Sequence, residues 1–234
     1  MSRRIFITGA NRGLGLELVR QLAERGDRIW AACRNPKQAD ALKDLQDRHA
    51  EQISIVALDV TDAASIRAAF DRVSGETSAL DWLINNAGIG GFLDFASVTG
   101  QRMLEIFAVN SVAPLMIART FQPLLKAGEQ PVLANMSSRI GSHAFRKETY
   151  LPAYGYPESK AALNMTSTQL AIDLKDDGIT VLPLSPGWVK TDMGGEEAPL
   201  EPAESIAGLV TVLDGVTLAD TGRFLSEAGE EIPW

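Results

Sequence analysis

The segment Ile5-Phe6-Ile7-Thr8-Gly9-Ala10-Asn11-Arg12-Gly13-Leu14-Gly15 decides the fold of this 234-residue chain. Its first three residues are continuously apolar, as in a strand buried on both faces, and three glycines follow. Leu14, Leu18 and Leu22 then recur at every fourth position and mark the apolar face of a helix. A strand, a glycine-rich turn and a helix in this order predict the first unit of a doubly wound α/β fold, although a plain tight turn uses glycine as well.

The rest of the chain repeats this alternation. Continuous apolar strands that alternate with helices predict a parallel sheet covered on both faces. We therefore expect a single domain over residues 1–234, with a Rossmann-type doubly wound parallel sheet of about seven strands and helices on both faces. The irregular stretch 185–203 contains a predicted substrate loop near 189–203, which we expect to be mobile. The other predicted strands lie near 29–33, 53–58, 80–84, 131–136, 179–184 and 222–225, and helices near 37–49, 66–73, 100–127 and 155–176.

Composition limits the functional classes. The net charge of −8 argues against nucleic acid or an anionic membrane as the main partner. Cys33 is the only cysteine, which excludes an intrachain disulfide and a zinc–cysteine cluster, and with two histidines we expect no metal site. The apolar run at the N-terminus is too short for a signal peptide, and no stretch approaches transmembrane length. A cytoplasmic protein is therefore expected.

The glycine-rich turn and the end of the second strand predict a dinucleotide. Glycines let the backbone approach a pyrophosphate, which the free N–H groups of the following helix attract. Proteins that bind NAD place a carboxylate about 20 residues beyond this turn. Here Arg34 occupies that position, and Arg12 lies inside the turn. Two guanidinium groups suit a 2′-phosphate and favour NADPH, although each arginine alone is equally consistent with a solvated surface residue.

Tyr156 and Lys160 lie four residues apart at the start of a predicted helix, on one face of it. The pKa of a free tyrosine is about 10. A cation about 4 Å away contributes about 4 kcal/mol at an effective dielectric constant near 20, enough to bring that pKa near 7. The pair is thus a candidate acid/base, although a surface Tyr and Lys on one helix would give the same spacing.

Two further polar positions precede this pair. Ser138 follows the fifth strand and could hold a carbonyl oxygen beside Tyr156, with Ser137 as the rival. Asn110 lies four residues before Pro114, which lacks the N–H that would bond the Asn110 carbonyl. A freed buried carbonyl takes a water, which could lead on to Lys160; a simple proline kink explains Pro114 equally well.

Other strand ends supply the remaining candidates. Asp59 follows the third strand and would lie beside an adenine, and Asn86 follows the fourth and would line the ribose side. Thr191, after the sixth strand, could bond a nicotinamide carboxamide. Trp188 and Met193 could line an apolar substrate pocket, and they could equally be residues of the core or of an interface.

Taken in order, these motifs resemble those of the short-chain dehydrogenase/reductase family over essentially the whole chain. Within the family the chain is most similar to the C-factor/sniffer-like carbonyl reductase branch, through residues 156–164 (YPESKAALN), 184–195 (LSPGWVKTDMGG) and 229–234 (GEEIPW). By this resemblance Ser138, rather than Ser137, is catalytic. The 18 residues from Ser138 to Tyr156 are more than usual, so residues 142–153 are expected to reshape the substrate entrance.

The resemblance implies an NADPH-dependent carbonyl reductase of ketones or aldehydes, with Tyr156 as the proton donor, and we expect a small apolar carbonyl substrate. A signalling or regulatory protein that retains an NADP-binding fold is the alternative, and an oxidising dehydrogenase is a second one. A homo-oligomer, a dimer or tetramer, is expected through the two long helices. The implied catalytic residues are Asn110, Ser138, Tyr156 and Lys160, and the implied cofactor-binding residues are Gly9, Asn11, Arg12, Gly13, Leu14, Gly15, Arg34, Asp59, Val60, Asn86, Ala87, Gly88, Tyr156, Lys160, Pro186, Gly187, Val189 and Thr191.

Overall fold

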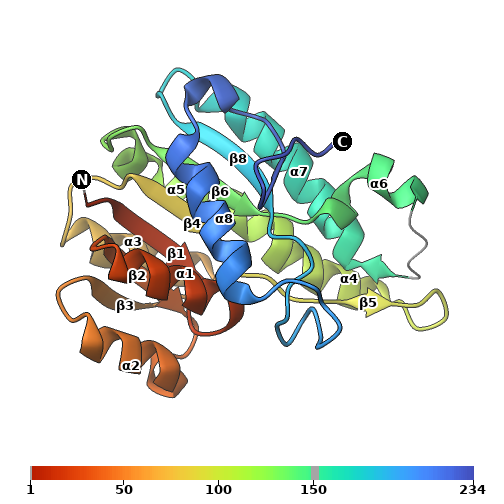
Figure 1. Ribbon diagram of the computed structural model, residues 1–234, viewed down its shortest axis with the longest axis horizontal. Coiled ribbons are helices and arrows are strands. Elements are labelled where there is room, and N and C mark those ends of the chain that lie inside the picture. Colours follow the sequence, from red (N-terminus) through yellow and green to blue (C-terminus); the bar gives the residue numbers. More distant parts are fainter. Residues whose placement is uncertain (1, 149–152) are drawn as a thin grey trace.

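A central parallel sheet organises the computed structural model, which describes residues 2–148 and 153–234 (Figure 1). Its seven strands follow the order β3-β2-β1-β4-β6-β8-β9, so the predicted fold class is confirmed. The winding direction reverses between β1 and β4, which is where doubly wound folds bind ligands. The strands are β1 (Arg4–Thr8), β2 (Arg28–Cys33), β3 (Ile53–Ala57), β4 (Trp82–Asn85), β6 (Val132–Met136), β8 (Thr180–Ser185) and β9 (Leu225–Ser226).

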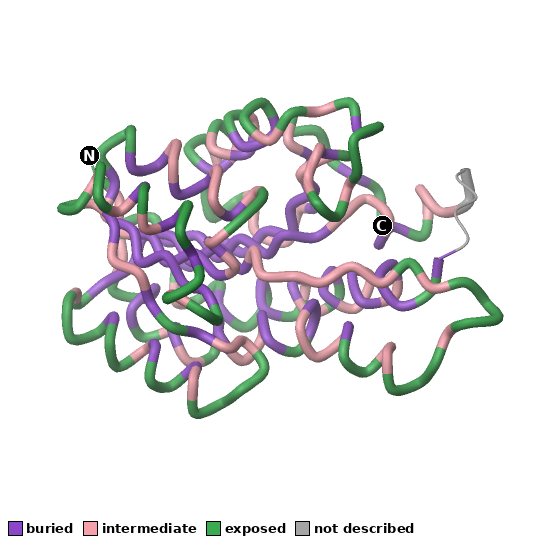
Figure 2. The backbone as a smooth tube through the Cα atoms, turned by 90° about the horizontal axis from the view of Figure 1, so that it is seen from below, coloured by how far each residue is buried: buried purple, intermediate pink, exposed green. Residues whose placement is uncertain are grey.

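Helices cover both faces of the sheet. One apolar cluster joins the sheet to α1 (Gly13–Glu24), α2 (Asp40–Arg48) and α8 (Pro202–Gly215). A second cluster joins the opposite face to α3 (Ala63–Ser74), α5 (Ala113–Lys126) and α7 (Tyr156–Asp173). Figure 2 shows the buried strands between the two helical layers, whose outer sides are exposed. Because both faces are covered, the strands are mainly apolar rather than alternating between apolar and polar residues.

The predicted helix near 100–127 is continuous but not uniform. It consists of α4 (Gly100–Phe107), a π-helical turn at Ala108–Val112, and α5. By length and composition alone this run is apolar enough to cross a membrane, so the expectation that no stretch has transmembrane length was wrong. Its buried side chains, such as Ile117 and Phe121, pack in the core, which explains its apolar character without a membrane.

Several elements were not predicted. Helix α8 has proline in its first turn and buried apolar residues at Ile206, Leu209 and Leu213, a helical pattern that the sequence does contain. A small antiparallel ladder joins β5 (Phe92–Leu93) to β7 (Tyr154–Gly155). Strands of two residues carry no periodicity, so only the tertiary structure reveals them. The short helices are η1 (Pro36–Gln38), η3 (Arg139–Gly141), α6 (His143–Glu148) and η4 (Leu218–Asp220).

The predicted substrate loop near 189–203 is closed on itself at its base. Val189 pairs with Leu200, and the Lys190 N–H donates to the Leu200 carbonyl at 2.9 Å. The Trp188 indole N–H donates to the Gly194 carbonyl at 2.8 Å. The loop ends where α8 begins, at Pro202, and its mobility stays a prediction.

Asp81 ties together the amino ends of three strands. Its carboxylate accepts from the Arg4 backbone N–H and guanidinium on β1 and from the Glu129 N–H before β6. Burial alone would raise the pKa of Asp81, but these hydrogen bonds hold it below its ordinary value. Because the pKa is depressed, the stabilisation is present above the unfolded-state pKa and is lost as the pH falls through the folded-state pKa.

We predict that Asp81→Asn lowers the free energy of unfolding by about 1.5–3 kcal/mol at pH 7, because it removes a charged hydrogen-bond acceptor from a buried position. Asp214→Asn, which changes a half-exposed partner of Arg3 and Arg25, is the matched control and should cost less than about 1 kcal/mol. Urea unfolding at pH 7 and pH 3 measures both. Equal losses for the two variants, or a loss for Asp81→Asn that persists undiminished at pH 3, would contradict the assignment.

Candidate active site

The predicted site residues gather at the carboxyl edge of the sheet, since they follow the ends of β1, β2, β4, β6 and β8. Parallel strands bring all these ends to one side. The β1 and β2 ends are joined directly, because the Ala10 N–H donates to the Ala32 carbonyl at 3.0 Å. The arginines that follow these two alanines, Arg12 and Arg34, are both exposed at this corner.

The glycine-rich turn has no room for side chains at two positions. A Cβ on Gly9, whose φ is +65°, would lie 2.8 Å from the Ala87 Cα. A Cβ on Gly15 would lie 2.1 Å from the Gly9 carbonyl oxygen. Both glycines are therefore required by the close approach of this turn to the end of β4.

The end of β4 holds that turn in place. The Thr8 hydroxyl accepts hydrogen bonds from the Asn86 and Ala87 N–H groups at 3.0 Å. The Asn86 side-chain amide donates to the Thr8 and Gly9 carbonyls. The Asn86 amide thus donates to the turn itself, and the prediction that Asn86 lines a ribose stays a prediction.

Helix α1 begins without a side-chain cap. Arg12 is its N-cap residue and makes no capping hydrogen bond, whereas Asp62 caps α3 and Thr99 caps α4. The Arg12 guanidinium instead pairs with Asp192 at 3.0 Å, and both side chains are largely exposed. This ion pair joins the glycine-rich turn to the predicted substrate loop. An exposed pair of this kind contributes about 0–1 kcal/mol, so a phosphate could displace Asp192.

Other predicted cofactor residues surround the same opening. A Cβ on Gly13 would lie 3.7 Å from the Thr191 methyl group, so the turn and the loop face each other. Asp59 accepts from the Thr61 N–H and hydroxyl, which lower its pKa, and the charge of Arg34 adds to this effect. The remaining predicted positions are partly exposed here (Asn11, Leu14, Val60, Ala87, Gly88, Pro186 and Gly187), apart from buried Val189.

Ser138 lies beside the Tyr156 phenol, close enough for its hydroxyl to lower the pKa of Tyr156. The neighbouring Ser137 turns the other way, because its hydroxyl donates to the Asn164 side chain on α7 at 2.5 Å. Ser138 begins the short helix η3, and its hydroxyl also accepts from the Ile140 N–H at 3.3 Å. The geometry therefore pairs Tyr156 with Ser138 and not with Ser137.

Lys160 is buried, and its ammonium donates to the Met136 carbonyl at 2.6 Å. Its Nζ lies 5.5 Å from the centre of the Tyr156 ring. Burial lowers the pKa of Lys160 to about 8. Burial also raises the pKa of Tyr156 to about 12, with the Ser138 hydrogen bond offsetting part of the rise.

The predicted pKa near 7 for Tyr156 was therefore wrong. That prediction placed a fully charged ammonium about 4 Å from the phenol and neglected the removal of both groups from water. Desolvation favours the neutral form of each group, so it raises the pKa of the tyrosine and lowers that of the lysine. At pH 7 the phenol keeps its proton and Lys160 is mostly charged.

Asn110 connects the segment after β4 to α7. It lies fully buried in the π-helical turn, a feature frequent at functional sites. Its side chain accepts from the Ile89 N–H and donates to the Ile89 carbonyl and the Ser159 hydroxyl. A Cβ on Gly88 would lie 3.4 Å from Asn110 Oδ1 and 3.8 Å from Lys160 Nζ, so Gly88 covers both residues. The predicted water on the Asn110 backbone carbonyl stays a prediction.

One aromatic residue at this site was not predicted. The Phe92 ring lies against Tyr156, with the ring centres 5.2 Å apart. Phe92 follows two glycines in a segment without periodicity, so no pattern marks it. Trp188 and Met193, predicted as a possible pocket wall, core or interface, are both exposed, and a Cβ added at Gly90 would lie 3.5 Å from Met193 Cγ. Of the segment 142–153, residues 149–152 lie outside the described residues.

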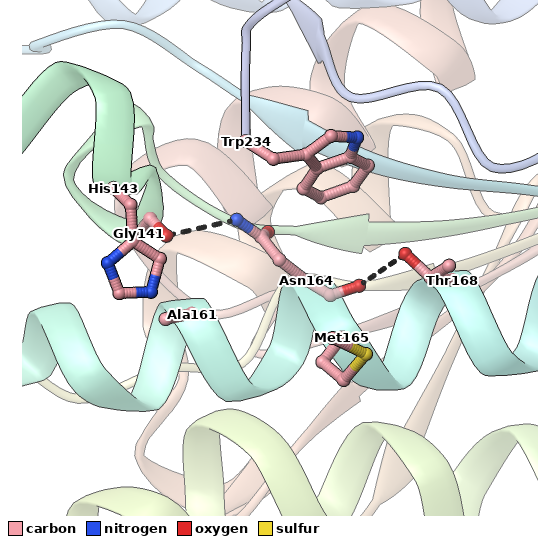
Figure 3. A pocket seen from close by; sticks show the side chains of 7 residues that line it. All are labelled: Gly141, His143, Ala161, Asn164, Met165, Thr168 and Trp234. Atoms are coloured by element: carbon pink, nitrogen blue, oxygen red, sulfur yellow. Dashed lines mark hydrogen bonds between the residues drawn. The ribbon is translucent and has the colours of Figure 1, made fainter.

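Two shallow hollows lie outside this site, on the outer side of α7. One of about 270 Å³ is drawn in Figure 3, with Trp234 on one side of Asn164 and Met165 on the other. The second, of about 220 Å³, shares Gly141, His143 and Ala161 with it. The four predicted catalytic residues line neither hollow.

Several known proteins are similar to this chain in both sequence and fold. The family model described as short chain dehydrogenase matches residues 3–201. The C-signal protein of Myxococcus xanthus is 38% identical over 159 residues, which cover 68% of this chain and 95% of that protein. The NADPH-bound carbonyl reductase from chicken fatty liver has a TM-score of 0.94 at 37% identity and covers 100% of this chain and 99% of its own. The carbonyl reductase Sniffer of D. melanogaster has a TM-score of 0.92 at 33% identity, and covers 100% of both chains.

These relatives confirm the resemblance to the C-factor/sniffer-like branch. The family match covers most of the chain, and the structural matches extend over all of it. The chain is a member of the short-chain dehydrogenase family.

Proposed function

We propose that this protein is an NADPH-dependent carbonyl reductase that acts on small apolar ketones or aldehydes. The observation that carries the proposal is the side-by-side placement of Ser138, Tyr156 and Lys160 at the sheet edge, next to an uncapped helix N-terminus. The carbonyl reductases with similar structures support it. Cytoplasmic location and a homo-oligomer are part of the same proposal.

The residues present fit a dinucleotide phosphate. The first N–H groups of α1 have no side-chain cap, and a helix N-terminus attracts phosphate. Gly9 and Gly15 keep the turn flat against β4, and Gly13 faces Thr191 across the opening. Arg12 and Arg34 would hold the 2′-phosphate, with Asp192 displaced from Arg12. When bound, NADPH would supply the hydride for the reduction.

The remaining chemistry belongs to the side chains. The Tyr156 phenol keeps its proton at neutral pH and donates it to the substrate oxygen as that oxygen gains negative charge. The Ser138 hydroxyl, which lies beside the phenol, holds the same oxygen. Lys160, charged below about pH 8, stabilises the phenolate that remains. Asn110 fixes Ile89 and Ser159 around this group and would hold the water through which the proton is replaced.

The signalling alternative keeps one specific support, the similarity to C-signal. An assay of a panel of ketones and aldehydes, in which the loss of NADPH absorbance is monitored, distinguishes a regulatory protein from a reductase. Turnover of at least one carbonyl supports the reductase. NADPH binding without turnover of any carbonyl would favour the regulatory role.

We predict that Tyr156→Phe lowers the rate of carbonyl reduction by about 10²–10⁴-fold, because the proton donor is removed. NADPH binding should stay nearly unchanged, since the ring and its packing remain. Tyr154→Phe is the matched control, two residues earlier on β7, and should keep full activity. Steady-state kinetics and a fluorescence titration measure both properties; activity of Tyr156→Phe within a few-fold of the parent would rule this residue out as the acid.

We predict that NADPH binds at least about tenfold more tightly than NADH. A charge-assisted hydrogen bond contributes about 1.5–3 kcal/mol, or one to two decades in affinity. Arg34→Ala and Arg12→Ala should each weaken NADPH binding and leave NADH binding unchanged. Lys126→Ala is the control, because Lys126 is an exposed lysine at the end of α5 that pairs with Asp177. Fluorescence titration decides the point, and equal affinities of the parent for the two cofactors would refute it.

We predict that kcat/KM for reduction falls as the pH rises above about 8. This parameter reports the ionisation of the free protein, in which Lys160 loses its charge near that pH. Below it the ammonium stabilises the phenolate of Tyr156; above it the neutral amine does not. The pH profile of kcat/KM should therefore show a plateau near neutral pH and an alkaline decline, and a constant value up to pH 10 would contradict this role.

A further inference from the structure

Phe92 is held beside Tyr156 by the small β5–β7 ladder. Phe92 pairs with Gly155 in antiparallel register, and the Tyr156 N–H donates to the Gly91 carbonyl at 3.2 Å. The two ring centres lie 5.2 Å apart at 43°, within the range of favourable aromatic contacts. The backbone itself therefore sets the position of the Phe92 ring relative to the phenol.

This ladder has little freedom to shift. A Cβ on Gly91 would lie 2.1 Å from Ile106 Cδ1, and one on Gly155 would lie 2.8 Å from the same atom. Ile106 is fully buried on α4. The two glycines thus let the ladder pack directly on α4, and Figure 1 shows β5 beside α4 at the end of the molecule that carries the start of α7. A ring fixed in this way is suited to recognition, because little conformational entropy is lost when a ligand binds.

One side of the Phe92 ring is free. The side chain is 46% exposed although it contacts a buried tyrosine. Met193, which lies over Gly90, offers a second exposed apolar surface from the loop after β8. The nearby Arg102 guanidinium is engaged by Glu105 and the Gly90 carbonyl, so it does not make this surface charged.

We propose that Phe92 is a specificity-determining residue that holds an aryl group attached to the substrate carbonyl, so that aryl ketones and aryl aldehydes are preferred. The inference rests on the proposed function, which places the substrate oxygen at Tyr156. An aryl group bonded to the carbonyl carbon would lie close to that oxygen, and the centre of the Phe92 ring lies 5.2 Å from the centre of the Tyr156 ring. Offset or tilted packing of two aromatic rings is favourable beyond the area that it buries.

The test compares acetophenone with cyclohexyl methyl ketone, which has the same ring size without aromaticity. Phe92→Leu keeps an apolar side chain but removes the ring. We expect kcat/KM for acetophenone to fall roughly three- to tenfold, mainly through KM, while the value for cyclohexyl methyl ketone changes less than about twofold. Because each ketone is compared with itself across variants, its intrinsic reactivity cancels.

Phe95→Leu is the matched control. Phe95 lies on the same segment, is 81% exposed, and contacts Tyr154 rather than Tyr156. Phe95→Leu should leave kcat/KM unchanged for both ketones. Phe92→Trp, which keeps an aromatic ring, should retain the preference for acetophenone. If Phe92→Leu lowers kcat equally for both ketones, Phe92 merely supports Tyr156 and the specificity role is overturned. An unchanged acetophenone value overturns it as well.

A binding measurement separates this inference from the proposed reaction. Calorimetric titration of acetophenone into the protein–NADP⁺ complex requires no turnover. Weaker binding to Phe92→Leu than to the parent, with cyclohexyl methyl ketone unaffected, supports the aryl site even if the parent reduces neither ketone. In that case the reductase proposal fails while the aryl site stands. Equal binding of acetophenone to the parent and Phe92→Leu refutes the aryl site.

Discussion

The close approach of the glycine-rich turn to the end of β4 is the constraint on which the site depends. The gap admits no side chain at Gly9 or Gly15. Thr8 and Asn86 fix it with four hydrogen bonds between the ends of β1 and β4. The order in which the chain adds strands reverses between β1 and β4. This contact therefore fixes the start of α1 relative to the carboxyl ends of the neighbouring strands.

Burial governs the electrostatics of the proposed acid. Tyr156 and Lys160 are both withdrawn from water, and desolvation moves their pKa values in opposite directions. The result is a protonated phenol next to a lysine that titrates near pH 8. This arrangement suits a group that must release its proton only when negative charge develops on a substrate. The hydrogen bond from Lys160 to Met136 anchors the ammonium to β6 and so fixes its position within the site.

Two segments from distant parts of the sequence border the opening of the site. The loop after β8 reaches the glycine-rich turn through Arg12 and Asp192, 180 residues apart. The β5–β7 ladder brings Phe92 to Tyr156. The glycine-rich turn carries Arg12, which suits a phosphate, whereas Met193 of the β8 loop and Phe92 of the ladder carry apolar surface. The same opening therefore combines a cationic corner with an apolar wall.

The sequence alone determined the parallel α/β fold, the glycine-rich turn and the pair of Tyr156 and Lys160, because strand apolarity, glycine spacing and the Tyr-x-x-x-Lys interval are local patterns. The choice of Ser138 over Ser137 came from the family resemblance. It also contained the signal for α8 in Pro202 and the apolar spacing that follows, although this was overlooked. Only the tertiary structure decided the pKa of Tyr156, the side to which Ser137 turns, the ion pair of Arg12 and the position of Phe92. Each of these depends on burial or on contacts between residues far apart in the chain, and no local pattern encodes either.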